Sequence, residues 1–233
     1  MFLSKKNLLC ALLFSAFAPM AVTYAKPSAD QQTAKYSHKQ DLQSPEGYWL
    51  QYSDDGKGQS IIHVYKGADN KLEGKIVVPF VNVVDDKVQV PDVACKKCGK
   101  IDENGYKADY SKWPNNQVQN LKIMWGFVKD GESQGKMGAV YDDGSILDPA
   151  NGKVYSCKMY TDDYGKKLHV RGYIGFSLFG RTQVWERMTK AQAKEEVARC
   201  GLTKDKTYPY ADASGKITNQ SLWEICSNIK VKK

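Results

Sequence analysis

The chain has 233 residues, a formal net charge of +8 and 42% hydrophobic residues. This length is sufficient for one substantial hydrophobic core with an appended segment. An excess of positive charge favours anionic partners. However, the lysines are scattered, and no stretch interleaves arginine with aromatic residues as a nucleic-acid groove would. The composition therefore argues against nucleic-acid binding.

Residues 1–25 have the features of a secretory signal peptide. Lys5 and Lys6 provide the positive segment, residues 8–22 are apolar, and residues 23–25 resemble a small-residue cleavage site. We expect a mature chain that begins at Lys26, without a transmembrane span, in the periplasm or outside the cell.

Two alternatives to cleavage remain at this N-terminus. An uncleaved membrane anchor is disfavoured because Pro19 interrupts an apolar run that is short for the ~20 residues of a bilayer span. Lipidation of Cys10 is disfavoured because Leu9 is not the small residue expected before a lipidated cysteine.

The mature chain begins with a polar segment, residues 26–44, whose lack of periodicity predicts a flexible linker. Secretion would place the cysteines in an oxidising compartment. Those that remain after cleavage are Cys95, Cys98, Cys157, Cys200 and Cys226. Their odd number leaves at least one free or intermolecular thiol.

Alternation of apolar and polar residues predicts a mainly β fold. It is clearest in residues 167–174 and 180–187, two strands joined by a short glycine-bracketed turn. We predict about eight strands, at 47–52, 60–66, 71–84, 117–129, 133–141, 153–161, 167–174 and 180–187. Because no amphipathic helix intervenes, the strands are expected to form an antiparallel up-and-down meander that closes into an eight-stranded β-barrel. A two-sheet sandwich is the alternative.

The periodicity changes to helical in residues 189–233. Thr189 and Gln192 form a capping-box sequence, and Gly201 is a suitable helix end. A second helix is predicted from about Asn219, so the segment is expected to be a helical hairpin. Cys200 and Cys226 lie on the apolar faces, and a bridge between them would contribute about 3 kcal/mol in the chain-entropy model.

Several motifs together resemble the secreted bacterial DUF 2147 family over about residues 45–188. They are G-Y-W at 47–49, C-x-x-C at 95–98, I-L-D-P-x-N-G-K-x-Y at 146–155, R-G-Y-I-G at 171–175 and G-R-T-Q-x-W-x-R at 180–187. The family is taken to be lipocalin-like, so the resemblance implies a β-barrel but no established reaction. Residues after Thr189 lie outside the pattern.

The resemblance also implies a structural role for two residues. Lipocalin-like barrels pair a G-x-W near the first strand with a basic residue on the last, and Trp49 and Arg187 are similar to that pair. A guanidinium stacked on the indole would close one end of the barrel.

The pair Cys95 and Cys98 has three interpretations. A structural disulfide that pins the long segment 85–116 is favoured. A redox pair would need a helix N-terminus to lower the thiol pKa, and a zinc site would need two more ligands at suitable spacing. We predict the pairs Cys95–Cys98 and Cys200–Cys226, with Cys157 free.

Catalysis is poorly supported. No nucleophile elbow, zinc-protease motif or phosphate-binding glycine loop is found, and we expect no cofactor and no metal. Residues 148–152 combine Asp–Pro with Asn–Gly, which favours a hairpin turn over a site.

A small-ligand binder is therefore the favoured hypothesis, and an envelope protein that docks partners through its C-terminal helices is the second.

If the lumen is open, the ligand is expected to be amphipathic and anionic, such as a fatty acid or lipid fragment. Two guanidiniums on neighbouring strands would repel unless an anion lies between them. The predicted head-group site is Arg171, Tyr173, Arg181 and Gln183. The apolar body would contact residues such as Leu121, Ile123 and Trp125. In the alternative, both arginines point to solvent or pair with Glu186 or a turn aspartate.

Overall fold

The computed structural model describes residues 43–52, 59–84, 87–89, 93–202 and 209–227. The chain divides into two compact units, Met1–Gln40 and Asp41–Lys233, and every described residue belongs to the second. The expected signal peptide and residues 26–42 of the expected linker lie outside the described residues.

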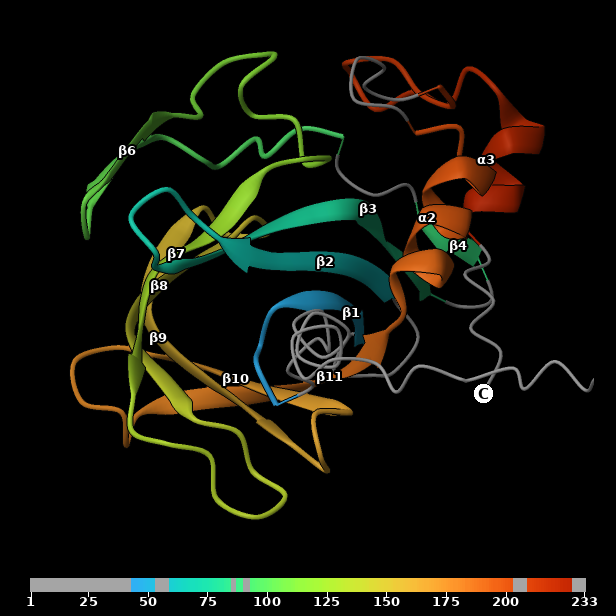
Figure 1. Cartoon of the computed structure of the whole chain (residues 1–233). Helices are drawn as coiled ribbons and strands as arrows, with labels where there is room; N and C mark the ends of the chain where they lie inside the picture. Colours follow the sequence, from blue (N-terminus) through green and yellow to red (C-terminus); the bar gives the residue numbers. More distant parts are fainter. Residues whose placement is uncertain (1–42, 53–58, 85–86, 90–92, 203–208, 228–233) are drawn as a thin grey trace, which may run out of the picture. The chain divides into compact units, whose positions relative to one another are not determined.

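Eight antiparallel strands of the described chain form a closed barrel (Figure 1). The order around the ring is β2-β1-β11-β10-β9-β8-β7-β3, and pairing of β2 with β3 closes it. The prediction of an eight-stranded barrel is therefore confirmed over a two-sheet sandwich. The strands are β1 (Gly47–Tyr52), β2 (Gln59–Lys66), β3 (Leu72–Val84), β7 (Lys122–Asp130), β8 (Val140–Asp148), β9 (Lys153–Asp162), β10 (Lys167–Tyr173) and β11 (Gly180–Met188).

One strand lies further along the chain than the sequence indicates. A strand was predicted at 133–141 with a turn at 142–144, whereas β8 runs through that turn. Asp143 has a φ of 56°, and the pairing with β9 shifts register between Tyr141 and Gly144. These residues therefore form a β-bulge, which uses the same Asp and Gly chemistry as a turn.

Large apolar side chains fill the inner face of the barrel. Trp49, Met124, Met159, Leu168 and Trp185 are each 0–2% exposed. A side chain that lined even a water-sized void would keep accessible surface, so the lumen is packed at these levels. Further buried members of this core are Ile62, Val64, Leu72, Ile76, Phe127, Cys157 and Val170.

The long segment between β3 and β7 contains structure that the sequence did not reveal. A short strand β4 (Lys87–Gln89) pairs with the end of β3, and β5 (Lys100–Glu103) and β6 (Tyr106–Asp109) form a separate hairpin. This hairpin packs against the outside of β7 and β8, where Trp125 Nε1 donates a hydrogen bond to the Glu103 carbonyl at 3.0 Å. Asn104 Nδ2, at the hairpin turn, donates to the Asp143 carbonyl at 2.6 Å.

Two helices follow the barrel, α2 (Lys190–Arg199) and α3 (Gln220–Ser227). Thr189 and Gln192 form the predicted capping box. The predicted disulfide joins Cys200, directly after α2, to Cys226 within α3. Ala193 and Trp223 belong to a second buried cluster with the outward-facing barrel residues Leu50, Ile61, Val78 and Met188. The apolar faces of the helices thus pack on the barrel wall. Of the described helices, none has the length and apolar character to cross a membrane.

Candidate functional site at the loop end of the barrel

One end of the barrel is closed by the predicted Trp49–Arg187 pair. The Arg187 guanidinium carbon lies 4.2 Å from the centroid of the Trp49 ring. The same guanidinium donates hydrogen bonds to the carbonyl oxygens of Gly165, Glu46 and Ser44. Residues 43–46 are therefore held at this end, which we call the closed end, and the last two residues of the expected linker belong to the folded unit.

The opposite end, which we call the loop end, carries the turns 149–152 and 174–179. Inner-face residues become accessible here: Ile146, Tyr155 and Gln183 are partly exposed, and Arg181 is exposed. The packed lumen therefore does not extend to the rim at this end.

A polar network separates the packed lumen from the loop end. Gln183 Oε1 accepts hydrogen bonds from Gln51 Nε2 at 2.9 Å and from Trp185 Nε1 at 3.1 Å. Ser60 Oγ donates to Gln51 Oε1 at 2.8 Å. The buried indole N–H is satisfied in this way, and the amide of Gln183 is fixed beside Arg181.

The four predicted head-group residues lie on two faces of the barrel. The register pairs Arg171 with Thr182 and Gly172 with Arg181. Because residues paired across strands share a face, Arg181 and Gln183 point inward with Trp185, whereas Arg171 and Tyr173 point outward. Each pair shares a face as expected, but the structure does not place Arg171 and Arg181 across from each other.

Arg171 holds the loop between β10 and β11. Its Nε and Nη2 donate to the Ser177 carbonyl at 2.9 and 2.6 Å, and Nη2 also donates to the Leu178 carbonyl at 3.2 Å. Nη1 donates to Thr182 Oγ1 at 3.0 Å. These acceptors satisfy the guanidinium without a bound anion, so Arg171 is a positioning residue for the loop.

Tyr173 donates a hydrogen bond to Asp142 Oδ1 at 3.3 Å on the outside of the barrel. Burial, together with the charge of Asp142 and this hydrogen bond, raises the pKa of Tyr173. The phenol is therefore a neutral donor at physiological pH.

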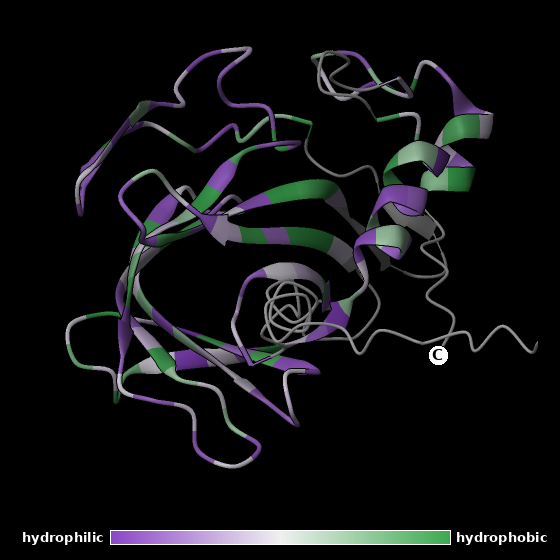
Figure 2. Cartoon of the chain, viewed as in Figure 1, coloured by the Kyte–Doolittle hydropathy of each residue, from purple (hydrophilic) through white to green (hydrophobic). Residues whose placement is uncertain are grey.

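The loop that Arg171 holds is strongly apolar and was not singled out from the sequence. Its large side chains are exposed by 70% for Ile174, 82% for Phe176, 79% for Leu178 and 71% for Phe179. Figure 2 shows hydrophobic stretches in this connection between β10 and β11. The signal that was available is the set of apolar residues Phe176, Leu178 and Phe179 between Gly175 and Gly180, where a turn is usually polar.

The residues expected to contact an apolar ligand body do not line the lumen. Trp125 is adjacent to the inward-facing Met124 and points to the outside, where the Tyr106 ring lies 4.9 Å away. Leu121 and Ile123 share its side of the strand by alternation. All three are buried, and they form the contact between the barrel wall and the segment that contains β5 and β6.

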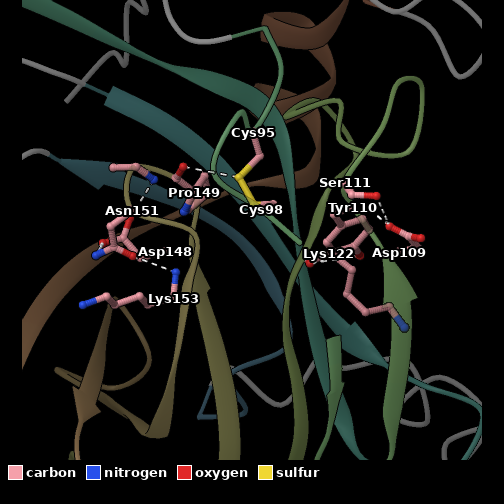
Figure 3. Close-up of a disulfide and its surroundings, with 11 residues drawn as sticks. Cys95, Cys98, Asp109, Tyr110, Ser111, Lys122, Asp148, Pro149, Asn151 and Lys153 are labelled. Atoms are coloured by element: carbon pink, nitrogen blue, oxygen red, sulfur yellow. Dashed lines mark hydrogen bonds between the residues drawn. A yellow bond between two sulfur atoms is a disulfide. The ribbon is translucent and has the colours of Figure 1, made fainter. Parts of the chain in front are cut away.

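The predicted Cys95–Cys98 disulfide is present and lies against the β8–β9 turn (Figure 3). Cys95 Sγ lies 3.3 Å from the Pro149 carbonyl oxygen, a close contact rather than a hydrogen bond because the bridged sulfur carries no proton. A Cβ atom at Gly152 would lie 2.1 Å from the Lys97 carbonyl oxygen. Both sulfurs are buried, which favours the structural interpretation over a redox pair.

The turn itself is built by Asp148, in agreement with the prediction of turn chemistry. Its Oδ1 accepts from the Ala150 N–H at 2.9 Å and its Oδ2 from Asn151 Nδ2 at 2.8 Å. Asn151 also donates to Tyr155 Oη at 3.0 Å, which links the turn to the inner face of the loop end.

Cys157 is free and fully buried, as predicted. Burial, with a smaller contribution from Asp142, raises the pKa of its thiol, so the thiolate form is strongly disfavoured. Within the described residues, no three His, Cys, Asp or Glu side chains cluster to hold a metal ion.

These features define a closed, up-and-down β-barrel with one sealed end and one accessible end. The chain belongs to the bacterial family described as "Uncharacterized protein conserved in bacteria (DUF2147)", which matches residues 47–187. Among solved structures, it is similar to HP1028 of Helicobacter pylori, described as belonging to the lipocalin family. That similarity has 14% identity and a TM-score of 0.44, and covers 70% of this chain and 92% of the other. None of the curated proteins matches the chain.

Proposed function

We propose that the protein binds a small anionic amphipathic molecule at the loop end of its barrel, without catalysing a reaction. The observation that carries this proposal is the position of Arg181 and Gln183. They occupy successive inward positions of β11 where the packed lumen gives way to accessible residues. A guanidinium beside a fixed amide suits a carboxylate or phosphate head group.

The apolar part of the ligand is expected to lie at the rim rather than in the lumen. The cross-sections of the barrel that contain Trp49, Met159 and Trp185 are filled by side chains and leave no room for an acyl chain. Ile146, Tyr155 and the exposed apolar side chains of residues 174–179 are the surfaces available at the loop end. This arrangement differs from a ligand that is enclosed inside the barrel.

Native mass spectrometry of the protein purified from its own host tests the proposal. We expect a co-purified anionic lipid-like molecule that is lost in Arg181→Ala and retained in Lys158→Ala. Lys158 is a matched control because it pairs with Arg171 and therefore lies on the outer face. An unliganded wild-type protein that also fails to bind added medium-chain fatty acid would contradict the proposal, as would a ligand retained by Arg181→Ala.

We also propose a periplasmic or extracellular location. Two intramolecular disulfides support it, because such bonds persist in oxidising compartments. N-terminal sequencing of protein from cell fractions tests this location. A mature N-terminus at Lys26 in the periplasmic or extracellular fraction is expected, and a full-length chain in the cytoplasm would contradict it.

The alternative of an envelope protein that docks partners through its C-terminal helices has less support. Ala193, Cys200, Trp223 and Cys226 face the barrel and are buried there. Ile225, 47% exposed, is a large apolar side chain that remains accessible on α3. A single side chain of this kind is ordinary on a protein surface.

A further inference from the structure

We propose that the loop formed by residues 174–179 docks the protein onto the surface of an anionic lipid bilayer. This role does not depend on a small ligand at Arg181. The first support is the clustering of Ile174, Phe176, Leu178 and Phe179, each at least 70% exposed, within six residues at a hairpin tip. Scattered exposed apolar residues need no explanation, but a contiguous cluster of this kind marks an interaction site.

Several backbone groups of the loop are hydrogen-bonded within the protein. Arg171 satisfies the carbonyl oxygens of Ser177 and Leu178 from the protein side. The Phe179 N–H donates to the Phe176 carbonyl at 3.0 Å, and the Ile174 N–H donates to the Phe179 carbonyl at 3.3 Å. Unsatisfied backbone groups are costly in a lipid environment, so internal pairing lowers the cost of inserting this tip.

The carbonyl groups of Ser177 and Leu178 are thus held by Arg171, while the four apolar side chains are exposed. A loop that was merely poorly packed would be expected to fold some of these side chains back onto the wall. Holding them outward by a guanidinium instead presents a preformed apolar tip, which loses little conformational freedom when it enters an apolar phase.

The charges around the tip select the kind of bilayer. Exposed cations at this end of the barrel are Lys96 and Lys97 in the segment before β5, Lys153 at the start of β9 and Arg181 at the start of β11. Asp142 and Asp143 lie near Tyr173 on the outer wall, and Asp142 accepts a hydrogen bond from it. The carboxylate of Asp148 is taken up by hydrogen bonds within its own turn. At the closed end the described charges are mixed, with Asp162 and Asp163 beside Lys136 and Lys166. An apolar tip at an end of the barrel with an excess of exposed cations is the pattern of interfacial binding to anionic lipid.

Sedimentation with vesicles tests this proposal. Full-length mature protein is mixed with vesicles of phosphatidylcholine alone or of phosphatidylcholine with phosphatidylglycerol. We expect the protein to bind the anionic vesicles and to bind the neutral vesicles less. Binding to the anionic vesicles should weaken as the salt concentration rises. The double variant Phe176→Ser with Leu178→Ser is expected to lower the partition coefficient by roughly tenfold or more, since each side chain loses its transfer from water.

Matched controls distinguish insertion of the loop into the bilayer from nonspecific adsorption and from misfolding. Ile225→Ser and Val184→Ser remove exposed apolar side chains of 47% and 42% exposure elsewhere, and should leave vesicle binding unchanged. A Phe176→Trp variant should show a blue shift of its emission with anionic vesicles. The urea midpoint of the double variant should stay close to that of the wild type.

Three results would overturn the proposal. They are the absence of vesicle binding by the wild type, equal binding by the double loop variant, and equal binding to neutral and anionic vesicles. In the first two cases the apolar tip would have another occupant, such as a protein. The two proposals share Arg181 and the loop, so their readouts distinguish them. A co-purified small molecule in native mass spectrometry reports the ligand, and sedimentation with vesicles reports the bilayer.

Discussion

Three arginines on β10 and β11 lie in different surroundings. Arg187 stacks on Trp49 and donates to three carbonyl oxygens at the closed end. Arg171 donates to the carbonyls of the 174–179 loop from the outer face. Arg181 is exposed on the inner side of the loop end. A single residue type thus seals one end and shapes a loop, and at the third position it is the residue on which the ligand proposal rests.

The first prediction concerns Arg187. Replacing it with alanine leaves the carbonyls of Ser44, Glu46 and Gly165 without this donor and exposes the Trp49 ring. We expect a loss of about 2–4 kcal/mol in the free energy of unfolding, measured by urea denaturation. Arg181→Ala, at an exposed position, should change it by less than about 0.5 kcal/mol. Similar losses in both variants would contradict a sealing role.

The second prediction concerns His63, which stacks on Tyr48 with ring centroids 4.3 Å apart on the outside of β1 and β2. Burial, with the nearby charges of Lys75 and Lys190, lowers the pKa of His63 from 6.5 to about 4. Between these values the unfolded chain binds a proton that the folded chain does not. The free energy of unfolding should therefore fall as the pH is lowered from about 6.5 to about 4.

A His63→Gln variant isolates this contribution from the titration of the carboxylates. The difference in unfolding free energy between wild type and variant should be constant above about pH 6.5 and should shift against the wild type below it. His169, whose pKa is also lowered, chiefly by burial, is present in both proteins and cancels. A difference that is flat from pH 7 to pH 4 would show that His63 titrates normally.

At the scale of elements, strands were predictable from alternation, whereas their register was not. The sequence correctly paired Arg171 with Tyr173 and Arg181 with Gln183 on their own strands. Which faces coincide depends on the connection 174–179, where an offset of one residue moves a strand's entire set of side chains to the other face. The Asp142–Gly144 bulge was also not predictable, because a bulge and a turn use the same residue types.

The packing of the barrel interior gives a third prediction. A Cβ atom at Gly144 would lie 2.3 Å from the Phe127 ring, whereas at Gly172, on the same inner face, the nearest heavy atom is 3.6 Å away. Gly144→Ala should therefore cost about 1–3 kcal/mol in unfolding free energy through overpacking. Gly172→Ala should be neutral or slightly stabilising. Equal effects of the two variants in urea denaturation would show that the lumen is less densely filled.

The two disulfides give a fourth prediction because they close loops of different length. Cys200–Cys226 spans 26 residues and Cys95–Cys98 spans 3. In the chain-entropy model, removing the first by serine substitution should cost about 3 kcal/mol, and removing the second about 2 kcal/mol or less. Hydrogen exchange of the first variant should accelerate in α3 before the barrel strands. Acceleration confined to β7 and β8 would contradict the assignment of that bond to the helices.

For the whole molecule, the barrel and both disulfides were predictable, but the relation between the barrel and its extension was not. Local patterns show that residues 189–233 contain helices, and only tertiary contacts show where their apolar faces are buried. The helices pack on Leu50, Ile61 and Val78, which the strand pattern alone would assign to an exposed outer face. The filling of the lumen was not predictable either, because strand alternation identifies the inward residues but not the space between them.

This packing leads to the last prediction, that the barrel does not fold well without its C-terminal helices. The family match ends at residue 187, yet the buried cluster of Leu50, Ile61, Val78 and Met188 is completed by Ala193 and Trp223. Truncation after Thr189 would expose this cluster on the barrel wall, a patch that favours aggregation. We expect the truncated chain to aggregate or bind a hydrophobic dye strongly.

A compensated variant distinguishes this explanation from a general effect of truncation. Threonine at Leu50 and Val78 keeps β-propensity and makes the uncovered wall more polar, so it should partly restore solubility to the truncated chain. In the full-length chain the same substitutions should destabilise, because they bury hydroxyl groups beneath the helices. A truncated barrel that is monomeric and as stable as the full-length protein would instead identify the helices as an independent module, free to dock elsewhere.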